Sequence, residues 1–281
     1  MKFMSFRRDG ADSYGRVEEE RVWPVSDAFR RRYPTLRDAL AAGRLQEAAA
    51  ERGLALPLAG LHFLPPVTNP SRILGIGMNY LEHIREMGRE PPEYPAMFIR
   101  FADSLVGHGQ ALRRPRVSTH YDFEGELAVV IGKAGRHIDR ARAHEHVAGY
   151  CCFMDGSVRD YQKHTSQFTA GKNFTASGAI GPWLVTADEI PDPKALQLET
   201  RVSGEQMQTG QLADLCIDIP AVIEYLSAVF ELQPGDVIAT GTPSGVGAAR
   251  TPPRWLRAGD IVQVTISGVG SLQNPVVDED A

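Results

Sequence analysis

The sequence predicts a β-rich α+β protein with a small N-terminal unit and a larger unit that carries the chemistry. Strand-like runs of β-branched and aromatic residues recur along most of the chain, separated by turns that contain glycine or proline. Helical periodicity is confined to short stretches, of which residues 35–50 and 219–230 are the clearest. A proline-rich stretch around Pro65 and Pro66 has the composition of a linker.

The first unit spans residues 1–66, and residues 67–281 form the second. The first unit contains a predicted strand at residues 2–7 and an amphipathic helix at residues 35–50, which Thr35 can cap. It holds no constellation of carboxylates or histidines, so we expect it to be structural.

Composition and charge exclude several classes of protein. The chain has 281 residues, of which 43% are hydrophobic and 23% charged, and its net charge is −5. A general affinity for nucleic acid or for acidic membranes is therefore not expected. No apolar run approaches the length of a membrane span, and the charged N-terminus lacks the apolar core of a signal peptide. The three cysteines form no C-x-x-C pair, which favours reduced thiols and a cytoplasmic protein.

Two carboxylates stand at the head of a predicted buried strand over residues 121–132. Glu124 and Glu126 are two residues apart and therefore point to the same face of a strand. A second apolar run, at residues 147–154, ends in Asp155. Three acids at strand ends would supply half of an octahedral shell for a hard cation such as Mg²⁺, Mn²⁺ or Ca²⁺. The alternative is an ordinary strand start with solvated acids.

A short helix predicted at residues 81–88 carries a second candidate pair. His83 and Glu86 are i,i+3 neighbours, and a carboxylate beside an imidazole raises its basicity. The pair suits a general base that takes a proton from water. The alternative is a surface pair on a short helix. Gly88 and the prolines that follow bound the helix tightly, as expected of a lid.

Three polar residues follow the third acid. Arg159 can bind a carboxylate bidentately, and Gln162, i+3 from it, can hydrogen-bond a carbonyl. An ion pair of Arg159 with Asp155 or Asp160 is the alternative. Lys172 could stabilise an enolate or an oxyanion beside a metal, or it could be an exposed loop lysine.

Two glycine-rich segments resemble nucleotide loops only superficially. Residues 75–80 fail the G-x-G-x-x-G pattern because Tyr80 stands at the third glycine. Residues 232–247 predict a turn, a strand and a glycine-rich loop, but contain no G-K-[ST]. The remaining strands are predicted at residues 95–101, 181–185, 198–203 and 261–266.

Five segments together resemble the fumarylacetoacetate hydrolase family. They are GMNYLEH (77–83), DFEGEL (122–127), DGSVRD (155–160), GKNF (171–174) and PGDVIATGTP (234–243). The resemblance covers about residues 73–277. It implies a catalytic domain of mixed β-sheets in a β-roll or sandwich with flanking short helices, a small N-terminal α/β domain, and usually a homodimer.

The resemblance also implies roles for individual residues. The implied ligands of Mg²⁺, for which Mn²⁺ or Ca²⁺ may substitute, are Glu124, Glu126 and Asp155. The implied catalytic residues are His83, Glu86 and Lys172. The implied substrate contacts are Arg159, Gln162, Gly241 and Thr242. Gly156 departs from the larger aliphatic residue of many members and could widen the site. Arg100 stands where many have lysine and could change how substrate polar groups are held.

The activity expected from this resemblance is that of a small acylpyruvate hydrolase. Such an enzyme cleaves a C–C bond in a 1,3-diketo acid, a small-molecule substrate of the kind met in aromatic catabolism. The alternative keeps the metal site but decarboxylates or tautomerises oxaloacetate, or isomerises an unsaturated 2-hydroxy-keto acid. A third hypothesis is a non-catalytic protein that binds keto acids.

Overall fold

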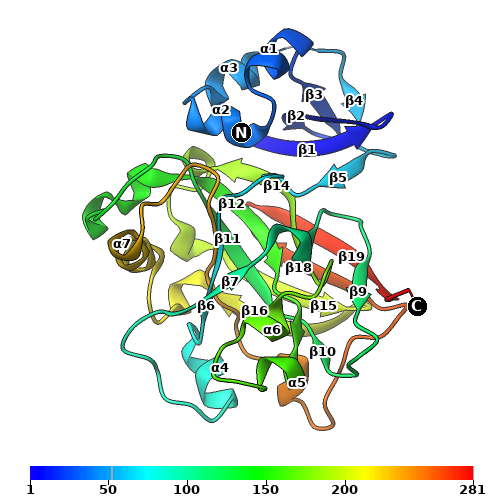
Figure 1. The fold of residues 1–281 in the computed structure, drawn as a ribbon, viewed down its shortest axis with the longest axis vertical. Coiled ribbons are helices and arrows are strands. Elements are labelled where there is room, and N and C mark those ends of the chain that lie inside the picture. The colour runs from blue at the N-terminus through cyan, green and yellow to red at the C-terminus, as the bar shows by residue number, and fades with distance from the viewer. Residues whose placement is uncertain (52, 281) are drawn as a thin grey trace.

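The computed structural model describes residues 1–51 and 53–280, and it has the predicted β-rich α+β architecture (Figure 1). The strands are β1 (Lys2–Arg8), β2 (Ala11–Glu18), β3 (Arg21–Pro24), β4 (Leu56–Pro57), β5 (His62–Leu64), β6 (Ile73–Gly77), β7 (Ala96–Arg100), β8 (Leu105–Val106), β9 (Leu112–Arg114), β10 (Tyr121–Asp122), β11 (Gly125–Ile131), β12 (Val147–Met154), β13 (Ser157–Val158), β14 (Gly178–Thr186), β15 (Gln197–Val202), β16 (Glu205–Gln211), β17 (Val237–Ala239), β18 (Ile261–Ile266) and β19 (Gly270–Asp278).

The helices are short. They are α1 (Asp27–Arg32), α2 (Leu36–Ala41), α3 (Leu45–Ala50), α4 (Leu81–Glu86), α5 (Arg159–Gln162), α6 (Thr169–Lys172) and α7 (Ile219–Val229). The described residues also form 3-10 turns at Ala102–Ser104, Arg140–His146, Ala187–Glu189, Pro193–Ala195, Leu212–Asp214 and Gly247–Ala249. Among the described residues, no helix combines the length and the hydrophobicity needed to cross a bilayer.

Two sheets pack on one another. The larger follows the order β4-β3-β2-β1-β14-β12-β11-β17-β6-β7, with β5 paired to β1 and β8 to β14. The smaller follows the order β16-β15-β18-β19-β9, and β10 pairs separately with β13. Strand β12 of the larger sheet contacts β18 and β19 of the smaller one, so the main core lies between the two sheets.

The central strand β11 is buried on both faces, as the continuous apolar run in its sequence predicts. Leu127 and Val129 point into the core between the two sheets. Ala128 and Val130 point the other way, into a second cluster that includes Leu36 of the N-terminal helix α2. The strand is therefore held rigidly, and so are the groups at its head.

The N-terminal unit extends the large sheet. Strand β1 pairs with β14 through Lys2–Val185 and Phe3–Leu184, and Figure 1 shows the helices α1 to α3 beyond that pairing. The domain boundary near residue 66 stays a prediction.

The prediction of one helix over residues 35–50 is wrong at its centre. Gly43, with φ +66°, ends α2 and lets the chain turn into α3. The predicted cap is present: Thr35 accepts from the Asp38 N–H, and Asp38 accepts from the Thr35 N–H in return.

Candidate active site and metal centre

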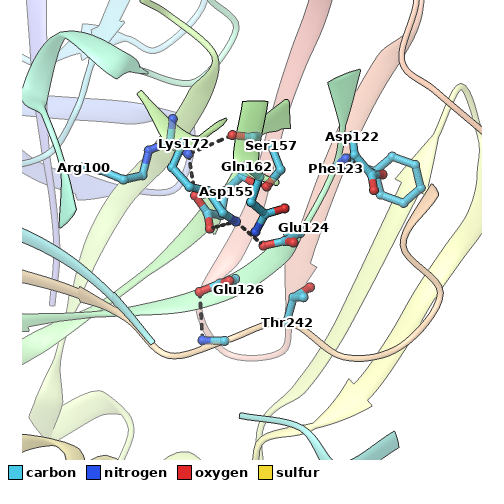
Figure 2. Close-up of polar contacts among 12 residues, drawn as sticks. Arg100, Asp122, Phe123, Glu124, Glu126, Asp155, Ser157, Gln162, Lys172 and Thr242 are labelled. Carbon is cyan, nitrogen blue, oxygen red and sulfur yellow. Dashed lines mark hydrogen bonds and ion pairs between the residues drawn. The ribbon is translucent and has the colours of Figure 1, made fainter. Parts of the chain in front are cut away.

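Two neighbouring strands bring the three predicted acids together. Strands β11 and β12 are antiparallel, with Gly125 opposite Met154, so the head of one strand lies beside the end of the other. The Asp155 N–H donates to the Glu124 carbonyl oxygen at 2.8 Å and closes this corner. Carboxylate oxygens of Glu124, Glu126 and Asp155 lie within 4.8 Å of one another. Figure 2 shows the three side chains pointing toward one another.

All three carboxylates are nearly out of contact with solvent. Asp155 is 0% exposed, Glu126 1% and Glu124 5%. Lys172, at the end of α6, compensates two of them: its Nζ lies 2.6 Å from Glu124 Oε2 and 2.5 Å from Asp155 Oδ2. Lys172 is itself buried, which excludes the exposed loop lysine that the sequence left open.

Two buried arginines form ion pairs with the same group of acids. Arg100 donates to an oxygen of Asp155 and, at 3.2 Å, to the Gly156 carbonyl. Arg159 contacts Glu124 Oε1 at 2.6 Å and Asp122 Oδ2 at 2.8 Å. Arg159 is therefore paired with Glu124 and Asp122, and not with either acid that the sequence had offered as an alternative.

The third ligand candidate, Glu126, has less compensation. Its Oε2 accepts the Gly241 N–H at 2.8 Å, and no cation pairs with it among the described residues. Burial, together with the charges of Asp155 and Glu124, raises the pKa of Glu126 well above its usual value. Burial also disfavours ionisation of Glu124, but Lys172 and Arg159 outweigh it and hold the pKa of Glu124 below its usual value.

This donor set fits a hard divalent cation. The three side chains offer only carboxylate oxygens, which is the chemistry that Mg²⁺, Mn²⁺ and Ca²⁺ prefer. A cation shared by all three would also supply the positive charge that Glu126 lacks.

The predicted histidine–glutamate pair forms on helix α4. His83 Nδ1 lies 3.1 Å from Glu86 Oε2, and the Gly245 N–H donates to Glu86 Oε1 at 2.9 Å. His83 is buried while the Glu86 side chain is 22% exposed, so the imidazole of the pair is not a solvated surface group. The loop after β17 thus fixes the carboxylate, which in turn fixes the imidazole.

A cleft of about 440 Å³ connects these groups. Its polar and charged lining is His83, Arg89, Glu124, Glu126, Arg159, Gln162, Lys163, Thr165, Ser166, Lys172 and Thr242. Its apolar lining is Ile76, Gly77, Met78, Met87, Phe98 and Phe168. Of the three expected acids, Glu124 and Glu126 face this cleft directly, while Asp155 is reached through Lys172.

Four predicted substrate contacts have different environments. Arg159 and Gln162 line the cleft, and the Arg159 Nη2 is buried with no hydrogen-bond partner among the described residues. Thr242 lines it too, but its hydroxyl already donates to the Gly125 carbonyl at 2.9 Å. Gly241 does not line the cleft, and its N–H is engaged by Glu126, so this geometry gives no support to a substrate contact there.

The two departures from the family pattern lie outside the cleft. A Cβ on Gly156 would lie 1.7 Å from the Ser177 carbonyl oxygen, so backbone already fills the space and the cleft is not widened. Arg100 faces Asp155 and not the cleft, so it does not hold substrate polar groups. Both expectations are corrected in this way.

Sequence reasoning missed two residues that organise the site. Asp122 is fully buried and accepts from Arg159 and from the Gly247 N–H at 2.8 Å. Gln208 is also buried. Its side-chain amide donates to the Thr242 hydroxyl at 2.7 Å and accepts from the Gly125 N–H at 2.9 Å, so it joins these two residues. The position of Asp122, two residues before Glu124, could have marked it as part of the site. Gln208 lies far from the other site residues in sequence, and no sequence pattern marked it.

Relatives of known name share most of this chain. Oxaloacetate tautomerase YisK of Bacillus subtilis is 44% identical over 215 residues, which are 75% of this chain and 71% of the relative. The human mitochondrial oxaloacetate tautomerase FAHD2A is 40% identical over 250 residues, or 86% of this chain and 80% of the relative.

Solved structures resemble the whole molecule. The fumarylacetoacetate hydrolase of Exiguobacterium antarcticum is 33% identical, with a TM-score of 0.87 over 99% of this chain and 100% of its own. The maleylpyruvate hydrolase of Sphingobium sp. SYK-6, solved with manganese(II) and pyruvate, is 26% identical, with a TM-score of 0.81 over 100% of both chains. The family profile described as Fumarylacetoacetate (FAA) hydrolase C-terminal matches residues 72–277, and the chain belongs to that family of enzymes.

Proposed function

We propose that the protein is a divalent-metal-dependent hydrolase that cleaves a C–C bond in a 1,3-diketo acid. The observation that carries this proposal is that His83, which Glu86 orients, lines the same cleft as Glu124 and Glu126 of the carboxylate cluster. Glu124, Glu126 and Asp155 would hold the cation, Mg²⁺ being our first choice. When bound, the ion would withdraw electron density from the oxygens of the keto acid.

The chain's own residues would bind and orient the substrate. The free Nη2 of Arg159 is a donor for the substrate's 2-oxo carboxylate. Gln162 Oε1 accepts from Arg159 at 3.0 Å, which leaves its amide N–H groups for a substrate carbonyl. Both donors are held before substrate arrives, which limits the ordering cost of binding.

His83 would move the proton. With Nδ1–H donating to Glu86, Nε2 is free to accept a proton from water while the water oxygen adds to the distal carbonyl carbon. Collapse of the tetrahedral adduct breaks the C–C bond and leaves the electron pair on the pyruvate fragment as an enolate. The proton held by His83 can then pass to that carbon, giving a carboxylic acid and pyruvate. The Lys172 ammonium adds positive charge near the developing enolate.

A second candidate, oxaloacetate tautomerase, is favoured by the names of the relatives that are 44% and 40% identical. The same base would then move a proton at carbon, and no bond to water would form. The size of the cleft favours the hydrolase, because about 440 Å³ holds on the order of fifteen water-sized groups. Oxaloacetate, with nine non-hydrogen atoms, would leave much of it unfilled.

The test is a Mg²⁺-dependent assay with product identification. The protein would be given acylpyruvates of increasing length and, separately, enol-oxaloacetate, whose ketonisation is followed by ultraviolet absorbance. Release of pyruvate and the matching acid supports the hydrolase. Ketonisation without any cleavage would transfer the assignment to the tautomerase. Tight binding of these acids in Mg²⁺ with no turnover of either kind would favour a binding protein.

A further inference from the structure

A second cavity, of about 470 Å³, lies apart from the cleft of the proposed metal site. It lies between the 3-10 turn Arg140–His146, the start of β12 and the first turns of α7. Much of its lining is apolar, and Ile190, Ile219 and Ile223 are buried there. None of the described residues lines both this cavity and the cleft, so the two are separate spaces.

One buried polar group in this cavity has no partner. Tyr150 of β12 lines the cavity and is 5% exposed, and its hydroxyl forms no hydrogen bond with any described residue. Burial and, after it, the charge of Asp192 raise the pKa of Tyr150 to about 12, so the hydroxyl keeps its proton and lies within the field of that carboxylate. Because a polar group this buried is normally hydrogen-bonded, the hydroxyl marks the point at which a polar ligand atom would be held.

The charged groups around the cavity favour a cation over an anion. Three carboxylates line it, those of Asp188, Asp192 and Asp218. The basic side chains among the described lining residues are His144 and Lys194, and Lys194 Nζ already lies 3.2 Å from Asp218 Oδ2. Asp192 forms no ion pair within the described part of the chain. A negatively charged ligand would therefore meet uncompensated negative charge.

The positive end of α7 does not reverse this preference. Asp218 caps the helix by accepting from the Ala221 N–H at 3.1 Å, so the helix terminus already has its negative partner. The same carboxylate also pairs with Arg140 at 3.0 Å. Both cations near the start of α7, Arg140 and Lys194, are thus compensated by one aspartate.

We infer that this cavity is a binding site for a small hydrophobic monoamine. The protonated amine has N–H groups for two acceptors, the Tyr150 hydroxyl oxygen and the Asp192 carboxylate, and its hydrocarbon part lies against the buried isoleucines. A neutral alcohol of the same shape could bond to the tyrosine but would gain no charge attraction from Asp192. A carboxylate would be repelled. The inference does not depend on the proposed function, because the cavity shares no described residue with the cleft.

NMR of the isoleucine methyl groups shows where such a ligand binds. Ile190, Ile219 and Ile223 line the cavity, whereas Ile76 lines the cleft. 2-Phenylethylamine and 2-phenylethanol, which have equal numbers of non-hydrogen atoms, are titrated into protein labelled with ¹³C at the isoleucine δ1-methyls, with Mg²⁺ present. The amine should shift the three methyl signals of the cavity in a saturable way and leave the Ile76 signal unchanged.

The affinities from these titrations test the two polar contacts. Wild-type protein should bind the amine about 5-fold tighter than the alcohol, the margin between charged and neutral hydrogen bonds, and should bind phenylacetate more weakly than either. Asp192→Asn should bring the ratio of the two affinities close to one. Tyr150→Phe should weaken both ligands about 2- to 10-fold. The control, Asp103→Asn, makes the same change in net charge at an exposed residue that does not line the cavity, and it should keep the wild-type ratio.

Three results would overturn the inference. A shift at Ile76 without shifts in the cavity would place the amine among the carboxylates of the cleft. Equal wild-type affinity for amine and alcohol, or a wild-type ratio in Asp192→Asn, would show that the acid does not recognise the ammonium. The absence of any saturable shift would show that the cavity binds no such amine. The proposed function would stand after each of these results.

Discussion

Replacing Lys172 with methionine tests whether its ammonium shares the carboxylate cluster with a metal ion. The ammonium contacts Glu124 at 2.6 Å and Asp155 at 2.5 Å and is 2% exposed. Methionine keeps the length and apolar stem of the side chain but leaves two buried carboxylates without this counter-charge. We therefore expect Lys172→Met to destabilise the metal-free protein and to strengthen metal binding.

The size of the first effect follows from the burial of the pair. At an effective dielectric constant of about 20, each contact supplies at least about 4 kcal/mol of gross attraction, most of which desolvation offsets. Removing one member of a buried pair usually costs about 3–5 kcal/mol because the other charge is left unpaired. That loss corresponds to a decrease in Tm of roughly 6–20 °C for a chain of this size.

The loss should depend on pH in a defined direction. Lys172 helps to keep the pKa of Glu124 low against the effect of burial, and a carboxyl with a lowered folded-state pKa stabilises the fold above its unfolded pKa. Without Lys172 the pKa of Glu124 rises. The deficit of the variant should be largest where Glu124 is ionised in both proteins, and it should shrink as the pH falls through the raised pKa of Glu124 in the variant, because a protonated carboxyl needs no counter-charge.

The assay is urea denaturation of wild type and variant in EDTA and in a Mg²⁺ series. A ligand that binds only the native state stabilises it by RT ln(1 + [L]/Kd), so tenfold tighter binding adds about 1.4 kcal/mol. Mg²⁺ should therefore stabilise Lys172→Met more than wild type. Lys133→Met is the control, because this lysine is 58% exposed and lies 3.8 Å from Glu145. Equal or smaller stabilisation of the Lys172 variant by Mg²⁺ would show that the ammonium and the ion do not compete for the same charge.

Three further substitutions probe the rest of the site. Glu126→Gln resembles the protonated acid that burial favours, so it should change the stability of the metal-free protein by less than about 1 kcal/mol. It should abolish both the stabilisation by Mg²⁺ and turnover. A normal Mg²⁺ response in denaturation curves would exclude Glu126 as a ligand. His83→Ala should lower kcat about 10²- to 10⁴-fold with Mg²⁺ affinity intact, and wild-type turnover by the purified variant would exclude His83 as the base. Gly156→Ala would force its Cβ to within 1.7 Å of the Ser177 carbonyl oxygen, so it should cost about 1–3 kcal/mol of stability, and an unchanged Tm would contradict that packing.

Local sequence signals predicted the elements whose causes are local. The strand predicted at residues 261–266 is β18, and the helix at residues 219–230 is α7. The two-residue spacing of Glu124 and Glu126 at the head of β11 also marked them as neighbours on one face. The break at Gly43 was missed because the apolar periodicity continues across it, and a single glycine inside a helical pattern is ambiguous.

Contacts between distant segments could not be predicted in this way. Asp122 accepts hydrogen bonds from Arg159 and from the loop after β17. These contacts depend on how β10, β13 and that loop pack together. The role of Gln208 depends on β16, which lies in the other sheet. Pairing of this kind is set by tertiary packing, and composition or periodicity carries no trace of it.

The two departures from the family pattern, Arg100 and Gly156, are parts of one structural feature. The Arg100 guanidinium donates to Asp155, to the Gly156 carbonyl and to Ser177 Oγ, and the Ser177 backbone fills the space that a side chain on Gly156 would need. A lysine at position 100 would carry the same charge, but its ammonium lacks the planar fork of a guanidinium that reaches acceptors on both sides. A larger residue at 156 would move Ser177 away from that fork. The arginine at position 100 and the glycine at position 156 are therefore compatible with each other. Both position Asp155 from outside the cleft, so the residues that line the cleft determine which substrate binds.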